Sequence, residues 1–299
     1  MSQFTICTYA DGGEFIEGDT AAIAWDVLRL TGSHRDCEVY DLTRTPHLKP
    51  YAIACLAASA ALQRQKQIIP TVVPPSNNAC NEHLQRLGLY EFFEATENRQ
   101  VWSRSSNLKV QKVTYPPGRV SENAAEVLTD GIQLTAGVRP QIVTSLDEVL
   151  LNALSHAESP IECVIVGQGF PQSGKVEVAV VDLGIGILNH LRRNAEYEQL
   201  SNDEEAIELA TQDGVTGTRR GTRNRLNEQN SGAGLHYLRK YCEAGGGECT
   251  ILSGRHWVTY HSGERVVGRL KQPFQGTLVN LRFFAAPGGE EGEKLCVEW

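Results

Sequence analysis

The sequence lacks the features that mark secreted, zinc-binding and membrane-spanning proteins. Its first residues have neither the charged start nor the long apolar run of a signal peptide. No apolar stretch approaches the roughly 18 residues that cross a bilayer, and residues 53–62, which are apolar but short, fit a core helix. None of the eight cysteines belongs to a Cys-x-x-Cys pair, so no zinc site is indicated. These absences predict a cytoplasmic protein with buried, free thiols and no membrane span.

A surplus of positive charge is also absent. The chain has 28 Lys and Arg against 36 Asp and Glu, and its net charge of -8 argues against a general nucleic-acid-binding surface. Hydrophobic residues make up 41% of the chain and charged residues 21%, a balance that is typical of folded proteins. The 299 residues suit one large domain or two ordinary ones.

The first hundred residues alternate between strand-like and helix-like patterns. Strands are predicted by β-branched and aromatic residues, and helices by small or amphipathic runs that begin near a capping residue. The predicted strands lie at 3–9, 37–42 and 68–73, and the predicted helices at 20–30, 50–66 and 76–87. This alternation is typical of a small α/β domain, which we place at residues 1–105.

Part of this segment resembles a STAS-type domain, the fold of anti-sigma-factor antagonists. The resemblance lies in the strand that ends at Asp41-Leu42-Thr43, in the small-residue helix after it, and in the closing turn Leu87-Gly88-Leu89. That family has a phosphorylatable Ser or Thr at the start of the helix. The matching residues here, 46–51, include neither, so we expect no phosphorylation switch in this domain.

Four short motifs follow in one order between residues 148 and 277. They are Glu148-x3-Asn152-x3-His156, Asp182-Leu-Gly184-Ile-Gly186, Ser231-Gly232-Ala-Gly234 and Gly276-Thr277. Each motif is weak by itself. Their order is informative because each lies on the type of element that its chemistry needs.

The first motif lies on a predicted helix at residues 140–157. A step of four residues turns only about 40° around a helix, so Glu148, Asn152 and His156 share one face. A carboxylate can take a proton from an attacking water, and an amide oxygen suits Mg²⁺. Taken alone, this spacing fits a solvated helix face at least as well.

The other motifs combine glycines with a polar side chain. Asp182 ends a predicted buried strand at 175–182, where its carboxylate can accept a hydrogen bond from the exocyclic amine of adenine. Asp-x-Gly turns are also common in proteins without a ligand. Gly232 and Gly234 open a predicted helix, and the backbone N–H groups of a helix start can bind phosphate.

Together the four motifs resemble those of the GHKL ATPase superfamily, which includes gyrase B, heat-shock chaperones and histidine kinases. By that resemblance Glu148 is the catalytic residue that orients the attacking water, and Asn152 holds Mg²⁺. His156 lies near the phosphates, Asp182 reads adenine, and Thr277 supports that contact. The glycines that shape the pocket and its lid are Gly184, Gly186, Gly232 and Gly234.

The resemblance implies an α+β arrangement in which a STAS-like α/β domain precedes a Bergerat-type ATP domain. The ATP domain is expected to be a two-layer α/β sandwich with a mixed sheet. We place a connector with a strand at residues 106–120, the ATP domain at 121–285, and a flexible tail at 286–299. The sequence contains no Gly-x4-Gly-Lys-Ser/Thr, so a P-loop is not expected.

Three functions remain open from the sequence. The first is an ATP-binding regulator with slow or partner-activated, Mg-dependent hydrolysis. The second is a serine/threonine protein kinase of the anti-sigma-factor type that acts on a separate partner. The third is a non-catalytic interaction module. The expected cofactors are ATP and Mg²⁺, a protein partner is expected in addition, and homodimerisation is open.

Overall fold

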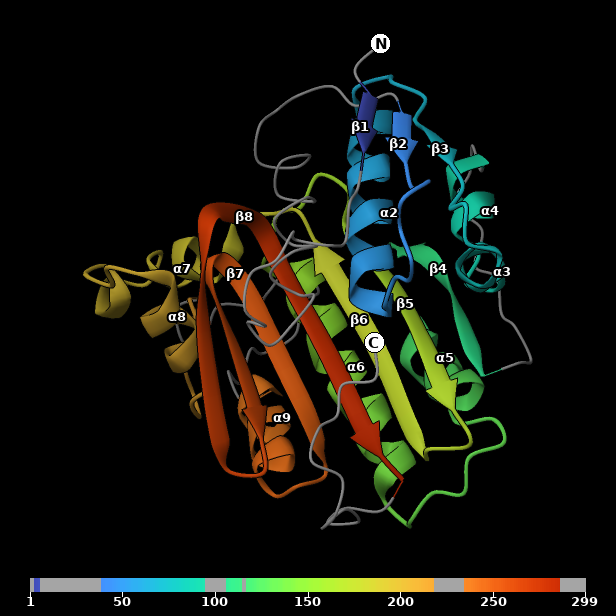
Figure 1. Ribbon diagram of the computed structural model, residues 1–299. Helices are drawn as coiled ribbons and strands as arrows, with labels where there is room; N and C mark the ends of the chain where they lie inside the picture. Colours follow the sequence, from blue (N-terminus) through green and yellow to red (C-terminus); the bar gives the residue numbers. More distant parts are fainter. Residues whose placement is uncertain (1–2, 6–38, 95–105, 115–116, 218–233, 286–299) are drawn as a thin grey trace.

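The computed structural model describes residues 3–5, 39–94, 106–114, 117–217 and 234–285. They form two sheets with helices around them (Figure 1), which confirms the expected α+β class. The strands are β1 Gln3–Thr5, β2 Val39–Asp41, β3 Thr71–Val73, β4 Asn107–Val113, β5 Cys163–Phe170, β6 Lys175–Asp182, β7 Gly247–His261 and β8 Glu264–Phe284. The helices are α2 Pro50–Gln65, α3 Asn78–Arg86, α4 Leu89–Glu94, α5 Val120–Leu128, α6 Val138–Ser155, α7 Gly186–Leu191, α8 Asp203–Ala210 and α9 Gly234–Glu243, with a short 3-10 turn at Ala195–Tyr197.

The smaller sheet has the order β1-β2-β3, and its strands are parallel. The helix α2 begins at a proline, which suits the first turn of a helix because its missing N–H needs no partner there. At the start of α3 the Asn77 side chain accepts the backbone N–H of Cys80 over 3.1 Å. Strands are present in all three predicted ranges, and the helices at 50–66 and 76–87 are confirmed. The third strand is shorter than expected, and residues 6–9 and 37–38 of the first two lie outside the described residues. The helix expected at 20–30 lies outside the described residues.

The larger sheet has the order β4-β5-β6-β8-β7. We expected a mixed sheet here, and that expectation is wrong: every described pairing in it is antiparallel. For two of these pairings the connections give the reason, because short turns join β5 to β6 and β7 to β8, and strands joined by short turns run antiparallel. The strand expected at 108–113 is confirmed as β4, which forms one edge of this sheet.

Helices cover both faces of the larger sheet. The helices of the expected ATP domain lie on one face, as a two-layer sandwich requires, and α2 of the N-terminal part covers the other face. The helices α5, α6 and α9 lie on one face, and α2 lies on the other (Figure 1). The burial of nearly every residue of β5 and β6 follows from this double cover.

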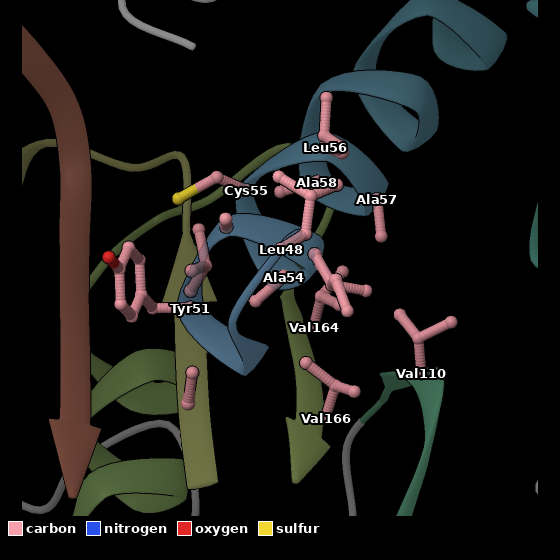
Figure 2. Packing of buried hydrophobic residues seen from close by; sticks show 14 of the residues in the cluster. Leu48, Tyr51, Ala54, Cys55, Leu56, Ala57, Ala58, Val110, Val164 and Val166 are labelled. Carbon is pink, nitrogen blue, oxygen red and sulfur yellow. The ribbon is translucent and has the colours of Figure 1, made fainter. Parts of the chain in front are cut away.

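The helix α2 is apolar around its whole circumference. Thirteen of its sixteen residues are buried, as expected for a helix enclosed by protein on all sides. One side contacts the smaller sheet, where the Tyr40 and Ser59 hydroxyls lie 2.7 Å apart. The other side packs on the larger sheet, and Figure 2 shows Val110, Val164 and Val166 of that sheet beside α2. The N-terminal part and the larger sheet therefore share one hydrophobic core.

No helix in the described part of the chain is long and apolar enough to cross a membrane. The five cysteines within that part, Cys55, Cys80, Cys163, Cys242 and Cys249, are all buried and free. This confirms the expectation of free thiols for these five. The other three cysteines lie outside the described residues.

Candidate functional site

Two rows of side chains cross three neighbouring strands on the face of the sheet that α6 covers. In the first row Asp182 of β6 pairs with Thr277 of β8, and Thr277 pairs with Ser253 of β7. The second row lies two residues further along each strand and consists of Val180, Val279 and Ile251. Side chains two residues apart on a strand point to the same face. The rows therefore form a floor with a polar end and an apolar end.

The wall opposite this floor is α6. Its apolar residues, among them Leu146 and Leu150, face the core, whereas Glu148 and Asn152 are half-buried. His156 follows the last residue of the helix, and its backbone N–H donates to the Asn152 carbonyl over 3.0 Å, which closes the helix at that end. The three polar side chains that were predicted on one helix face thus lie along one wall.

The floor and the wall enclose a cleft of about 940 Å³, counting the part open to solvent. Six of the residues predicted from sequence line it: Glu148, Asn152, His156, Asp182, Gly186 and Thr277. They come from three separate segments of the chain and meet in one place. Gly184 is not among the lining residues, and Gly234 begins α9, whose next residue, Leu235, lines the cleft. Gly232 lies outside the described residues.

Two glycines next to Asp182, one in the turn that follows it and one on β8, are packed too closely to carry side chains. A Cβ atom on Gly184 would lie 1.9 Å from the carbonyl oxygen of Ala157. Gly276 has a φ of +87°, and a Cβ atom there would lie 2.2 Å from the carbonyl oxygen of Asp182. Both glycines therefore fix the backbone on either side of the Asp182 carboxyl.

We expect Gly276→Ala to destabilise the fold more than Gly118→Ala does. Both glycines have positive φ, at +87° and +61°, but a Cβ atom on Gly118 would meet nothing within 4 Å. Both variants therefore carry the cost of an alanine at positive φ. At Gly276 the overlap with the Asp182 carbonyl oxygen adds about 2 kcal/mol of destabilisation. Urea unfolding of the two variants measures the difference, and equal losses would contradict the close packing at Gly276.

The Asp182 carboxyl is almost fully buried, with 4% of the residue exposed. Burial raises its pKa to about 7, because the charged form loses its hydration. Hydrogen bonds partly oppose this rise. The Gly184 N–H donates to Oδ1 over 2.9 Å, and Thr277 donates from its backbone and its hydroxyl. The cleft therefore holds a carboxyl group that changes charge near neutral pH.

This raised pKa predicts a pH-dependent stability. Between the ordinary value of 3.8 and about 7 the folded state holds a proton that the unfolded state releases, so the contribution of Asp182 is full at low pH and is lost as the pH rises through about 7. The full shift corresponds to roughly 4 kcal/mol. We expect Asp182→Asn to remove this decrease in the free energy of unfolding with rising pH. Unfolding of both proteins by urea between pH 4 and pH 8 measures it.

The comparison between the two proteins is needed because other groups titrate in the same range. Burial lowers the pKa of His83 and of His190 to about 4, so their contributions are instead lost as the pH falls below about 6.5. The difference between wild type and Asp182→Asn cancels these terms. A difference that does not change with pH would contradict the raised pKa of Asp182.

A second imidazole, which the motifs did not include, lies at the end of the cleft beside His156. The rings of His156 and His190 are tilted by 35°, with centroids 4.7 Å apart. His190 lines the cleft from α7, and its buried Nδ1 has no hydrogen-bond partner among the described residues. Together with the depressed pKa this indicates that His190 is neutral near pH 7.

Ser253 and the apolar floor were not predicted from the sequence either. The alternation on β6 and β8 could have indicated Val180 and Val279, because each lies two residues from a predicted site residue. No comparable signal points to His190 or Ser253. Their places depend on how α7 and β7 pack against segments that are distant in sequence.

Asn152, the residue predicted to hold Mg²⁺, lines the cleft with a side chain that carries an oxygen atom. The described residues contain no group of three or more His, Cys, Asp or Glu side chains that could hold a metal ion. An Mg²⁺ ion in a nucleotide site commonly uses one or two protein oxygens, with phosphate and water oxygens as the other ligands. The Asn152 side chain in the cleft fits that pattern.

No protein-family model matches the chain, and no curated protein matches its sequence.

Proposed function

We propose that this protein binds ATP with Mg²⁺ in the cleft and acts as a nucleotide-dependent regulator whose hydrolysis is slow or partner-activated. The proposal rests on one observation. A buried carboxyl, a half-buried carboxylate and an amide line a single cleft, and these groups are Asp182, Glu148 and Asn152. The resemblance of the four motifs to the GHKL ATPases supports ATP as the ligand.

The residues that line the cleft offer a partner for each part of a nucleotide. The apolar floor of Val180, Val279 and Ile251 offers a surface for a base, and Asp182 beside it offers an acceptor for an exocyclic amine. Glu148 and Asn152 offer a base for water and a ligand for Mg²⁺. Two imidazoles, from His156 and His190, provide nitrogen atoms for phosphate oxygens.

Contacts between the N-terminal part and the Asp182 turn support a regulatory role. The Gln65 side chain at the end of α2 donates to the carbonyl oxygen of Pro160. Ser159 precedes this proline, and its Oγ atom accepts the N–H of Leu183 over 3.1 Å. A shift of α2 would thus reach the residue that follows Asp182. Through this route, a partner bound to the N-terminal part can favour one state of the cleft.

The test is ADP formation from Mg-ATP by the purified full chain, together with ATP binding measured by calorimetry. Binding with turnover supports a self-sufficient ATPase, and binding without turnover supports the partner-activated form. Transfer of the γ-phosphate to an added protein would instead identify a protein kinase. Absence of ATP binding in the presence of Mg²⁺ would reject the proposal.

A further inference from the structure

The hydroxyl of Ser253 joins three segments around the cleft. Ser253 is 1% exposed. Its Oγ atom donates to the carbonyl oxygen of Gly276 over 3.1 Å and accepts the backbone N–H of Ile187 over 3.0 Å. One side chain on β7 therefore fixes the start of the Thr277 segment and the first turn of α7.

Both bonds act on residues next to the Asp182 carboxyl. Gly276 precedes Thr277, which donates to that carboxyl. Ile187 follows Gly186, where a Cβ atom would lie 2.9 Å from the Ser253 Oγ atom. The distance between the Thr277 segment and the start of α7, which lie on either side of the Asp182 carboxyl, therefore depends on this hydroxyl.

The bonds of Ser253 are needed because the regular ladder ends there. The register of β7 and β8 shifts after the pair of Ser253 and Thr277. Beyond this pair the backbone hydrogen bonds between β7 and β8 no longer continue in the same register. The hydrogen bond from Ser253 Oγ to the Gly276 carbonyl oxygen connects the strands at this point. A buried hydroxyl that satisfies one donor and one acceptor is well suited to this task.

We infer that Ser253 is a positioning residue that sets the selectivity of the cleft for a purine with an exocyclic amine. It does so by holding Thr277 and the α7 turn against Asp182. The inference rests on the proposed function for the identity of the ligand. The placement of the two backbone segments by Ser253 does not depend on any ligand.

The experiment compares binding of ATP and of inosine triphosphate, which carries a carbonyl oxygen in place of the amine. Wild type is expected to prefer ATP, and Ser253→Ala is expected to reduce the ratio of the two affinities by about fivefold or more. Ser253→Thr keeps a hydroxyl and is expected to restore the ratio. The matched control is Ser59→Ala, which removes a fully buried, hydrogen-bonded hydroxyl of α2 away from the cleft.

A second measurement needs no nucleotide. Amide hydrogen exchange at Ile187 is expected to be about tenfold faster in Ser253→Ala than in wild type, because its N–H loses its acceptor. Ser59→Ala should leave this rate unchanged. An unchanged exchange rate, or a lower melting temperature with an unchanged affinity ratio, would overturn the inference. Failure of wild type to bind ATP would reject the proposed function instead, and the exchange rate would still decide the role of Ser253.

Discussion

Asp182→Asn is expected to weaken ATP binding about 100-fold while the fold remains intact. The carboxyl lies at the polar end of the floor, where it would accept the exocyclic amine of the base. An asparagine has nearly the same shape, but one carboxyl oxygen becomes an NH₂ group. In the complex this donor can face the exocyclic amine of the base, which is also a donor. A lost hydrogen bond to a charged group and an unpaired donor together account for a change of this size. Calorimetric titration with Mg-ATP measures it.

Asp130→Asn is the control, because it makes the same chemical change at an exposed position outside the cleft. Its affinity for ATP should equal that of wild type. Circular dichroism and urea unfolding establish that Asp182→Asn is folded. Full affinity in a folded Asp182→Asn protein would remove Asp182 from the proposed adenine contact.

Glu148→Ala is expected to keep ATP binding within about threefold of wild type and to lower hydrolysis by about 100-fold or more. The reason is that a positioned general base contributes to the reaction far more than to the binding of the substrate. Glu148 lines the cleft from α6, one turn before Asn152. ADP formation under single-turnover conditions, with or without an activating partner, measures the loss.

The neighbouring carboxylate gives a matched control for this variant. Asp147 is exposed on the same helix and does not line the cleft. Asp147→Ala should therefore hydrolyse ATP at the rate of wild type. Equal hydrolysis in Glu148→Ala and wild type would mean that another group acts as the base, or that the activity belongs to a contaminant.

Local periodicity predicted the parts of the site that lie within one element. The four-residue spacing of Glu148, Asn152 and His156 predicted a shared helix face, and all three line one cleft. The alternation of residues 175–182 predicted a strand that ends at Asp182, and the structure has that strand. These predictions succeeded because helix and strand geometry repeats over a few residues.

Features that depend on distant segments were not predicted. The strand β5 went unnoticed because Gly167 and Gly169 interrupt its β-branched pattern. In the fold these glycines allow α5 to approach: a Cβ atom on Gly169 would lie 2.1 Å from the carbonyl oxygen of Leu128. The contact between the His156 and His190 rings and the bonds of Ser253 likewise arise only after the chain has folded.

The shared core around α2 has a consequence for how the chain can be divided. The helix supplies apolar side chains to both sheets at once, so neither sheet has a complete interior without it. A fragment that starts after residue 105 would leave the α2-facing side of β5 and β6 in water, including Val164, Val166 and Val181. Such an apolar surface promotes aggregation. Because buried residues from both sides of the predicted domain border form one cluster, we expect the two parts to unfold together rather than one after the other.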